Sequence, residues 1–132
     1  MISLGSIMED IRTAVDHQLG IPASVGMRNA GDEKPCVVIE LEGADGLVHL
    51  KEAANDWPSL QVRFEIVSAT HAEALTTLDA LVLTFQSKQN FSGYSLCTTA
   101  VSVSARAETP DDGSSDAERI VALRCTFHAM ET

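Results

Sequence analysis

The segment from Leu60 to Val67 most narrowly limits what this chain can fold into. Apolar residues alternate there with Gln, Arg and Glu, and the apolar set is Leu60, Val62, Phe64 and Ile66. A period of two is typical of a strand with one packed face and one wet face. A helix follows at once, because Thr70 and Glu73 have capping-box spacing and precede an apolar stripe of Leu75, Leu78, Leu81, Val82 and Phe85. This strand and helix predict a helix layer packed on a sheet.

A second capping box predicts a helix near the start of the chain. Ser6 and Glu9 are three residues apart, so each side chain can satisfy a backbone N–H at the helix start. The apolar residues that share one face of this helix are Ile7, Ile11, Ala14, Val15 and Leu19. Gly20 and Pro22 then stop it. We therefore expect a helix over residues 7–19, followed by a loop over 23–35, which has no period.

Three further segments have strand character. Cys36–Glu42 places Val37, Ile39 and Leu41 on one face. A turn at 43–46, a short return strand at 47–51 and a loop at 52–58 are expected next. After a break at 88–93, the Ser-, Thr- and Val-rich residues 94–107 form a strand whose shared face holds Cys97, Val101, Val103 and Ala105. The last strand, 119–129, points Val121, Leu123, Cys125 and Phe127 one way.

The predicted order of elements is α-β-(β)-β-α-β-β. No internal repeat and no linker divides the chain, so residues 1–132 are expected to form one domain. Both helix stripes are buried if the helices pack on the same face of a sheet. The predicted fold class is therefore α+β, with a mostly antiparallel sheet of four to five strands and two helices on one face.

Composition narrows the cellular setting. The chain has 132 residues, of which 45% are hydrophobic and 21% charged, as in an ordinary globular domain. No apolar run is long enough to span a bilayer, and no basic start leads into the apolar stretch of a signal peptide. We therefore expect the protein in the cytoplasm.

The charge balance argues against nucleic-acid binding. Nine Lys and Arg against nineteen Asp and Glu give a net charge of −10, and the basic residues are scattered singly. Duplex binding needs clustered basic side chains that release phosphate counterions, so sequence-specific binding is not expected. An acidic surface suits a passage that DNA crosses without sticking, although solubility explains the charge equally well.

The residues that usually carry chemistry form no motif. Three cysteines make an odd count without CxxC spacing and lie in strand-like segments, so we expect free thiols at Cys36, Cys97 and Cys125. The histidines have no zinc-ligand spacing, and the chain contains no phosphate-binding loop and no nucleophile elbow. The acidic segment 108–118 lacks the ligand spacing of a calcium loop. No catalytic, cofactor or metal residue is assigned, and the chain is not expected to be an enzyme.

Candidate contact residues come from three places. Trp57, the only tryptophan, precedes the 60–67 strand and is either a lid on the core or an interface anchor. The polar face of the 94–107 strand faces either water or a neighbouring subunit, and it carries Ser102, Ser104 and Arg106. The segment 108–118 is expected to be a mobile hairpin tip and contributes Asp111, Asp112, Asp116 and Glu118.

The whole pattern resembles the tail terminator, or tail completion, proteins of long-tailed bacteriophages and phage-like particles. An amphipathic helix leads to Pro35-Cys-Val-Val-Ile-Glu40, and Leu60-Gln-Val-Arg-Phe-Glu-Ile-Val67 runs straight into the helix at 70–86. Two strands joined by an acidic loop close the chain. The family shares a Pro-x-Val-Val-Ile strand, a central strand followed by an Ala- and Leu-rich helix, and often an aromatic residue where Trp57 stands.

The resemblance implies a structural role. It implies a ring, typically hexameric, that caps the tail tube, stops its polymerisation and joins it to the head connector. The implied partners are further copies of the chain, the tail tube protein and a head completion protein, with DNA passing through the lumen. The implied location is the head-proximal end of the tail, after assembly in the host cytoplasm, and a head-side joining protein remains open as a near neighbour.

A different class of function also remains open. The alternative is a small-ligand-binding domain or enzyme on a ferredoxin-like α+β sheet. It predicts a concave apolar pocket with convergent polar groups. The assembly role instead predicts extended interfaces and edge strands available to a neighbour.

Overall fold

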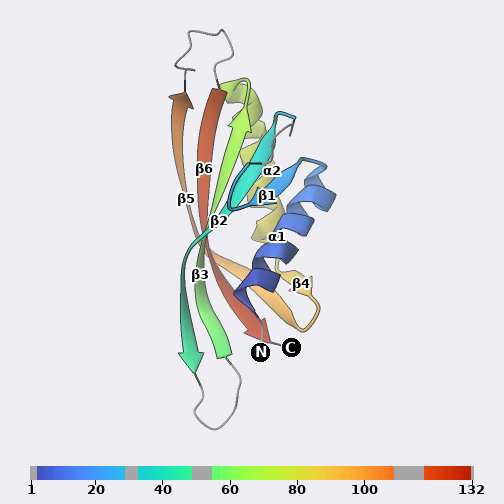
Figure 1. The fold of residues 1–132 in the computed structure, drawn as a ribbon, viewed down its shortest axis with the longest axis vertical. Coiled ribbons are helices and arrows are strands. Elements are labelled where there is room, and N and C mark those ends of the chain that lie inside the picture. Colours follow the sequence, from blue (N-terminus) through green and yellow to red (C-terminus); the bar gives the residue numbers. More distant parts are fainter. Residues whose placement is uncertain (1–2, 29–32, 49–54, 109–117, 132) are drawn as a thin grey trace.

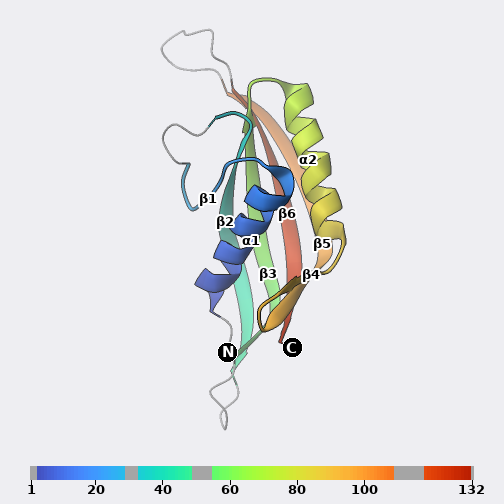
Figure 2. The same cartoon turned by 90° about the vertical axis from the view of Figure 1, so that its right-hand side faces the viewer.

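Both helices lie on the same face of one long, twisted sheet (Figures 1 and 2). A computed structural model describes residues 3–28, 33–48, 55–108 and 118–131. Its elements are α1 (Leu4–Leu19), β1 (Ala23–Val25), β2 (Cys36–Val48), β3 (Asn55–Ser68), α2 (His71–Gln86), β4 (Gln89–Phe91), β5 (Tyr94–Glu108) and β6 (Glu118–Glu131). The strand order is β1-β2-β3-β6-β5-β4. The predicted α+β class with two helices on one face is confirmed.

The sheet differs from the prediction in its strand count and direction. It has six strands rather than four or five, and β1 runs parallel to β2 while the other neighbours are antiparallel. β1 lies within the segment 23–35, which was predicted as a loop. It is joined to β2 from its start, because the Val37 N–H donates to the carbonyl of Pro22, the residue before β1, at 2.9 Å. A strand of three residues is too short to show a period in the sequence.

Strands β2 and β3 form a longer hairpin than the sequence predicted. The turn expected at 43–46 is wrong, because β2 continues to Val48 and still pairs with Asn55. Irregularities between Leu41 and Gly43 and between Asp45 and Leu47 absorb the extra residues within the ladder. Leu47 and Val48 therefore belong to β2, and 55–58, predicted as loop, belong to β3. The remainder of both predicted segments, 49–54, lies outside the described residues.

The core lies between the helices and the middle of the sheet. The inward residues of the 60–66 strand are fully buried, as predicted, and so are those of β6, where Val121, Leu123, Cys125 and Phe127 are 1% exposed or less. Phe64, Phe85 and Phe127 from β3, α2 and β6 meet with ring centroids 5.3 to 6.3 Å apart. Such tilted and edge-on packing joins the central strands to α2.

The two helix starts differ in how well the sequence predicted them. Thr70 caps α2, and its hydroxyl accepts from the Glu73 N–H at 3.2 Å, as predicted. The box at Ser6 and Glu9 is wrong, because α1 starts earlier and Ser3 is its cap, accepting from the Ser6 N–H at 3.1 Å. Ser3 and Ser6 repeat the same spacing one turn earlier, so the upstream serine takes the role. The predicted stop holds, since Gly20 has a φ of 65°.

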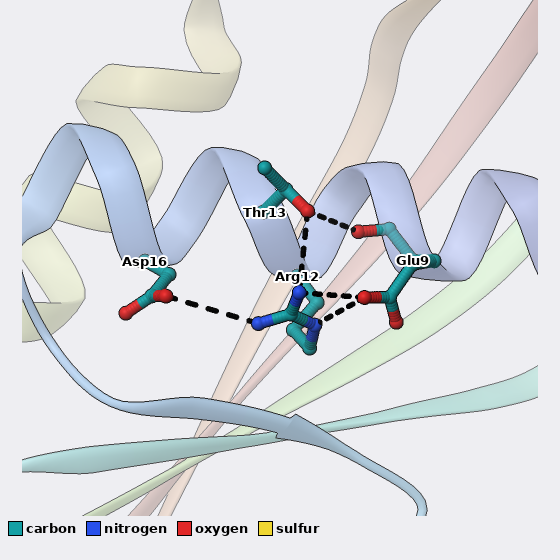
Figure 3. Close-up of polar contacts among 4 residues, drawn as sticks. All are labelled: Glu9, Arg12, Thr13 and Asp16. Carbon is teal, nitrogen blue, oxygen red and sulfur yellow. Dashed lines mark hydrogen bonds and ion pairs between the residues drawn. The ribbon is translucent and has the colours of Figure 1, made fainter.

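Glu9 does not cap α1 but binds Arg12 on the outer face of the helix (Figure 3). The Arg12 Nε donates to Glu9 at 2.7 Å, and Asp16 lies on the other side of the same guanidinium at 3.8 Å. The hydrogen bond from Arg12 lowers the pKa of Glu9 below its ordinary value. This exposed network faces away from the sheet, while Ile7, Ile11, Ala14 and Val15 are buried, as predicted.

No helix in the described part of the chain is long and apolar enough to cross a membrane.

Candidate functional site

Strand β5 is covered along only part of its outer edge. β4 pairs with Tyr94, Ser95 and Leu96, whereas β6 pairs with β5 along its whole length. Among the described residues, no strand lies beside β5 on the β4 side beyond Leu96. The stretch from Thr98 to Glu108, called here the free β5 edge, therefore offers backbone groups to a further strand.

A bulge at Thr99 sets which side chains this edge presents. The register shifts between Thr98 and Ala100, and the Thr99 hydroxyl donates to the Thr126 carbonyl at 3.1 Å. The bulge reverses the alternation, so Cys97 lies on the opposite face from Val101 and Val103. The prediction that Cys97 shares their face is therefore wrong, since an inserted residue leaves no mark on the local pattern.

Val101 and Val103 lie on the helix-covered face, yet they are 50% and 53% exposed. Helix α2 packs chiefly over β3 and β6 and makes fewer contacts with β5. Between α2 and β5 lies a pocket of about 240 Å³ whose lining includes Val82, Phe85, Thr98 and Val101. We call it the α2–β5 groove.

The α2–β5 groove has an apolar extension along the helix. Leu75 precedes Val82 by seven residues, which places the two on the same flank of α2. Leu75 is itself exposed. The groove therefore lies beside the free β5 edge and is walled by apolar side chains from both elements.

The opposite, helix-free face of the sheet carries charges that are already paired. Arg124 donates to Glu42 at 2.8 Å, and Arg63 lies 2.9 Å from Glu65. Cross-strand partners form a row of Glu40, Arg63, Arg124 and Ser102 across four strands. Beside this row is a shallow pocket of about 310 Å³ whose lining includes Glu42, Gln61, Ser102 and Arg124.

Two buried titratable groups are held in their neutral forms, Cys125 beside the α2–β5 groove and Tyr94 at the start of β5. Burial raises the pKa of the Cys125 thiol to about 12, so it stays protonated and is a poor nucleophile at neutral pH. The Tyr94 hydroxyl donates to Asp10 at 2.6 Å, and burial together with this bond raises its pKa above the ordinary value. Tyr94 thus ties the start of β5 to α1. The predicted thiols are confirmed as free cysteines, and Cys36 is buried like Cys125.

Of the predicted contact residues whose backbone is described, four lie in the β5–β6 hairpin and Trp57 lies in β3. Ser102 and Ser104 are exposed on the free β5 edge. Arg106 and Glu118 lie in β5 and β6, and Trp57 lies in β3 rather than in a loop before it. The side chains of these three residues, and the whole of Asp111, Asp112 and Asp116, lie outside the described part.

The sequence reading missed the exposed apolar residues Leu75, Val101 and Val103, which it assigned to packed faces. The available signal was the size of the side chains that alternate with them along the chain. In β5 these valines alternate with small Ser and Ala residues rather than with the long polar side chains of β3. A strand with small or polar residues on its second face specifies its pairing weakly, so this alternation does not by itself predict a packed apolar face.

No protein-family model matches this chain, and no curated protein is significantly similar to it. The fold and its edge define an α+β domain with an unpaired strand edge beside an apolar groove. The resemblance to tail terminators rests on the sequence pattern alone.

Proposed function

We propose that this chain is a structural assembly protein whose copies join into a closed ring, the tail terminator of a long-tailed phage or phage-like particle. The observation that carries the proposal is the free β5 edge. Proteins that stay monomeric usually blunt such edges with Lys, Pro, bulges or a covering segment. Residues 98–105 contain neither Lys nor Pro, and the one bulge in this stretch lies at its start.

The shape of the sheet supports a ring with two distinct faces. The end of β2 and the start of β3 lie together at one end of the molecule, and the end of β5 and the start of β6 lie together at the opposite end (Figure 1). In a ring whose axis follows the strands, one set of ends would meet the tail tube protein and the other the head completion protein. A contact between two different surfaces closes into a ring by rotation, and six copies are the expected number.

The proposed mechanism is geometric rather than chemical. Seating the ring on the last layer of the tube would block addition of further tube subunits, and no residue would perform covalent chemistry. The net charge of −10 per chain would repel the phosphates of DNA passing the lumen. The protein would act at the head-proximal end of the tail, after assembly in the host cytoplasm.

One observation favours a second candidate, a small-ligand-binding domain. The pocket on the helix-free face brings Glu42, Gln61 and Arg124 together beside Ala100 and Cys125. Convergent polar groups over an apolar floor are typical of a ligand site. This function requires no assembly, so the oligomeric state distinguishes the two candidates.

The test is light scattering coupled to size exclusion over a concentration series, with negative-stain images of the peak. Six copies of the 14.1 kDa chain would give a species of about 85 kDa with a central hole. A monomer at every concentration contradicts self-assembly of the chain. A compact dimer without a hole contradicts the ring and favours the ligand-binding candidate.

A further inference from the structure

We infer that neighbouring copies join head to tail, with the edge of β2 in one copy pairing with the free β5 edge of the next. The inference rests on the proposed ring and names the contact that builds it. Three features of the described residues support it. The first is a second free edge, on β2. The second is the row of cross-strand partners that contains the exposed Leu41 of this edge, and the third is the set of charges along the edge.

The second free edge belongs to β2. β1 pairs only with Val37, Val38 and Ile39. From Glu40 to Val48, no strand of the described chain lies on that side of β2. On their outer sides, β2 and β5 are thus each paired at one end with a three-residue strand, and no other described strand lies along the rest.

The open stretches run antiparallel and overlap in height over five residues, because β1 covers the start of β2 and β4 covers the start of β5. β2, β3, β6 and β5 alternate in direction, so β2 and β5 are antiparallel to each other. Leu41, Val62, Cys125 and Val101 form one row of cross-strand partners. A copy rotated about an axis parallel to the strands therefore brings Glu40–Ala44 of one chain level with Thr98–Ser102 of its neighbour, in antiparallel orientation.

The same row supplies an apolar group for the α2–β5 groove. Leu41 is 37% exposed and lies on the helix-covered face, as do Val101 and Val103. Pairing keeps Leu41 on that face, beside the groove lined by Val82 and Val101. A slide by two residues would place it next to Val103 and preserve the face, because side chains alternate with a period of two. Val25 on β1 is also exposed and extends the apolar surface on this side.

Charge and closure select this pairing over the symmetric ones. Glu40, Glu42 and Asp45 lie along the open stretch of β2, whereas residues 98–105 of β5 carry no ionisable group. Pairing two β2 edges would bring like charges from the two copies together, which costs free energy even though Glu40 and Glu42 each have an arginine partner within their own sheet. Pairing two β5 edges would close as a two-fold dimer and leave Leu41 uncovered. Only the β2-to-β5 contact covers part of both edges, Glu40–Ala44 on β2 and Thr98–Ser102 on β5.

The experiment uses two edge variants of the full chain. We expect Leu41→Glu and Val101→Glu each to abolish the ring and to run as monomers. Each variant keeps one intact edge, so mixing them should give a heterodimer of about 28 kDa and nothing larger, as expected for a head-to-tail contact. The matched control is Leu83→Glu on the solvent side of α2, which is 70% exposed and should retain the ring. Circular dichroism and thermal unfolding verify that all three variants are folded.

A covalent test covers the case in which an edge variant unfolds. Leu41 and Val101 lie on strands separated by β3 and β6, so cysteines at both positions cannot join within one chain. We expect the Leu41→Cys, Val101→Cys double variant to give a ladder of disulfide-linked oligomers on a non-reducing gel, which neither single variant gives. No ladder means that these edges do not meet.

The outcomes separate this contact from the ring itself. Rings formed by wild type and by both edge variants would keep the ring and overturn the edge contact. A Leu41→Glu variant that dimerises alone would indicate a two-fold β5 contact and overturn the head-to-tail arrangement, as would a mixture that stays monomeric. A wild-type chain that is monomeric at every concentration overturns both proposals.

Discussion

At the scale of single residues, the contact between Tyr94 and Asp10 holds the start of β5 against α1. Tyr94 is buried and donates to the Asp10 carboxylate at 2.6 Å. Tyr94→Phe keeps the aromatic side chain but removes this hydrogen bond to a charged group. We therefore expect it to lower the free energy of unfolding by about 1–2 kcal/mol. Urea unfolding measures this. If the hydrogen bond is the cause, Asp10→Asn added to Tyr94→Phe should cost little more.

The same hydroxyl predicts how stability changes in alkali. Burial and the Asp10 carboxylate raise the pKa of Tyr94 above its ordinary value of 10.0. The folded state then holds the phenolic proton at a pH where the unfolded chain loses it, so the stability from this group is present below pH 10 and falls as pH rises. We expect wild type to lose more stability between pH 9 and 11 than Tyr94→Phe does. Equal losses would show that this phenol does not set the alkaline dependence.

Individual residues also show where a sequence pattern succeeds and fails. The alternation of Leu60, Val62, Phe64 and Ile66 predicted full burial correctly, because β3 is a central strand that α2 covers. Val101 and Val103 alternate in the same way and are half exposed, because α2 packs chiefly over β3 and β6 and covers β5 less. Periodicity identifies a face but not how completely another layer covers it.

At the scale of elements, α1 offers a direct comparison of two candidate caps. Ser3 accepts from the Ser6 N–H at 3.1 Å, whereas the Ser6 hydroxyl satisfies no backbone group of the helix start among the described contacts and only accepts from the Ser3 hydroxyl at 2.7 Å. We expect Ser3→Ala to lower the free energy of unfolding by about 0.5–1 kcal/mol, and Ser6→Ala to change it by less than about 0.5 kcal/mol. Thr70→Ala in α2 is the reference for a cap that the sequence predicted correctly. A larger loss from Ser6→Ala than from Ser3→Ala, measured by urea unfolding, would place the cap at Ser6.

Short and irregular elements explain most of the differences between expected and observed fold. The long strands β3, β5 and β6 and both helices were predicted from their periods, with errors of a few residues at the ends. β1 and β4 have three residues each and depend on tertiary pairing. The glycines at 43 and 46 indicated a turn, but Gly43 pairs with Gln61 of β3, and the ladder absorbs Glu42 and Gly46 at two irregularities.

At the scale of the whole molecule, the strand order determines which surfaces are free, and local patterns carry no information on it. The α+β class and the placement of both helices on one face followed from the need to bury two apolar stripes. That β5 is nearly an edge strand follows only from the order β1-β2-β3-β6-β5-β4. Ser102 and Ser104 were predicted as candidate contacts from the Ser- and Thr-rich face of their strand, and only the strand order shows how far the outer side of β5 is open in the described residues.

Net charge predicts how a ring of this chain responds to salt. Each copy carries −10, and the proposed seam pairs backbone and apolar groups rather than opposite charges. Repulsion between copies should therefore oppose assembly at low ionic strength and weaken as the screening length shortens to about 10 Å at 0.1 M salt. We expect the ring fraction, measured by light scattering at fixed chain concentration, to rise between 20 and 500 mM NaCl. Dissociation on adding salt would instead indicate that ion pairs hold the copies together, which contradicts a seam made of β2 and β5.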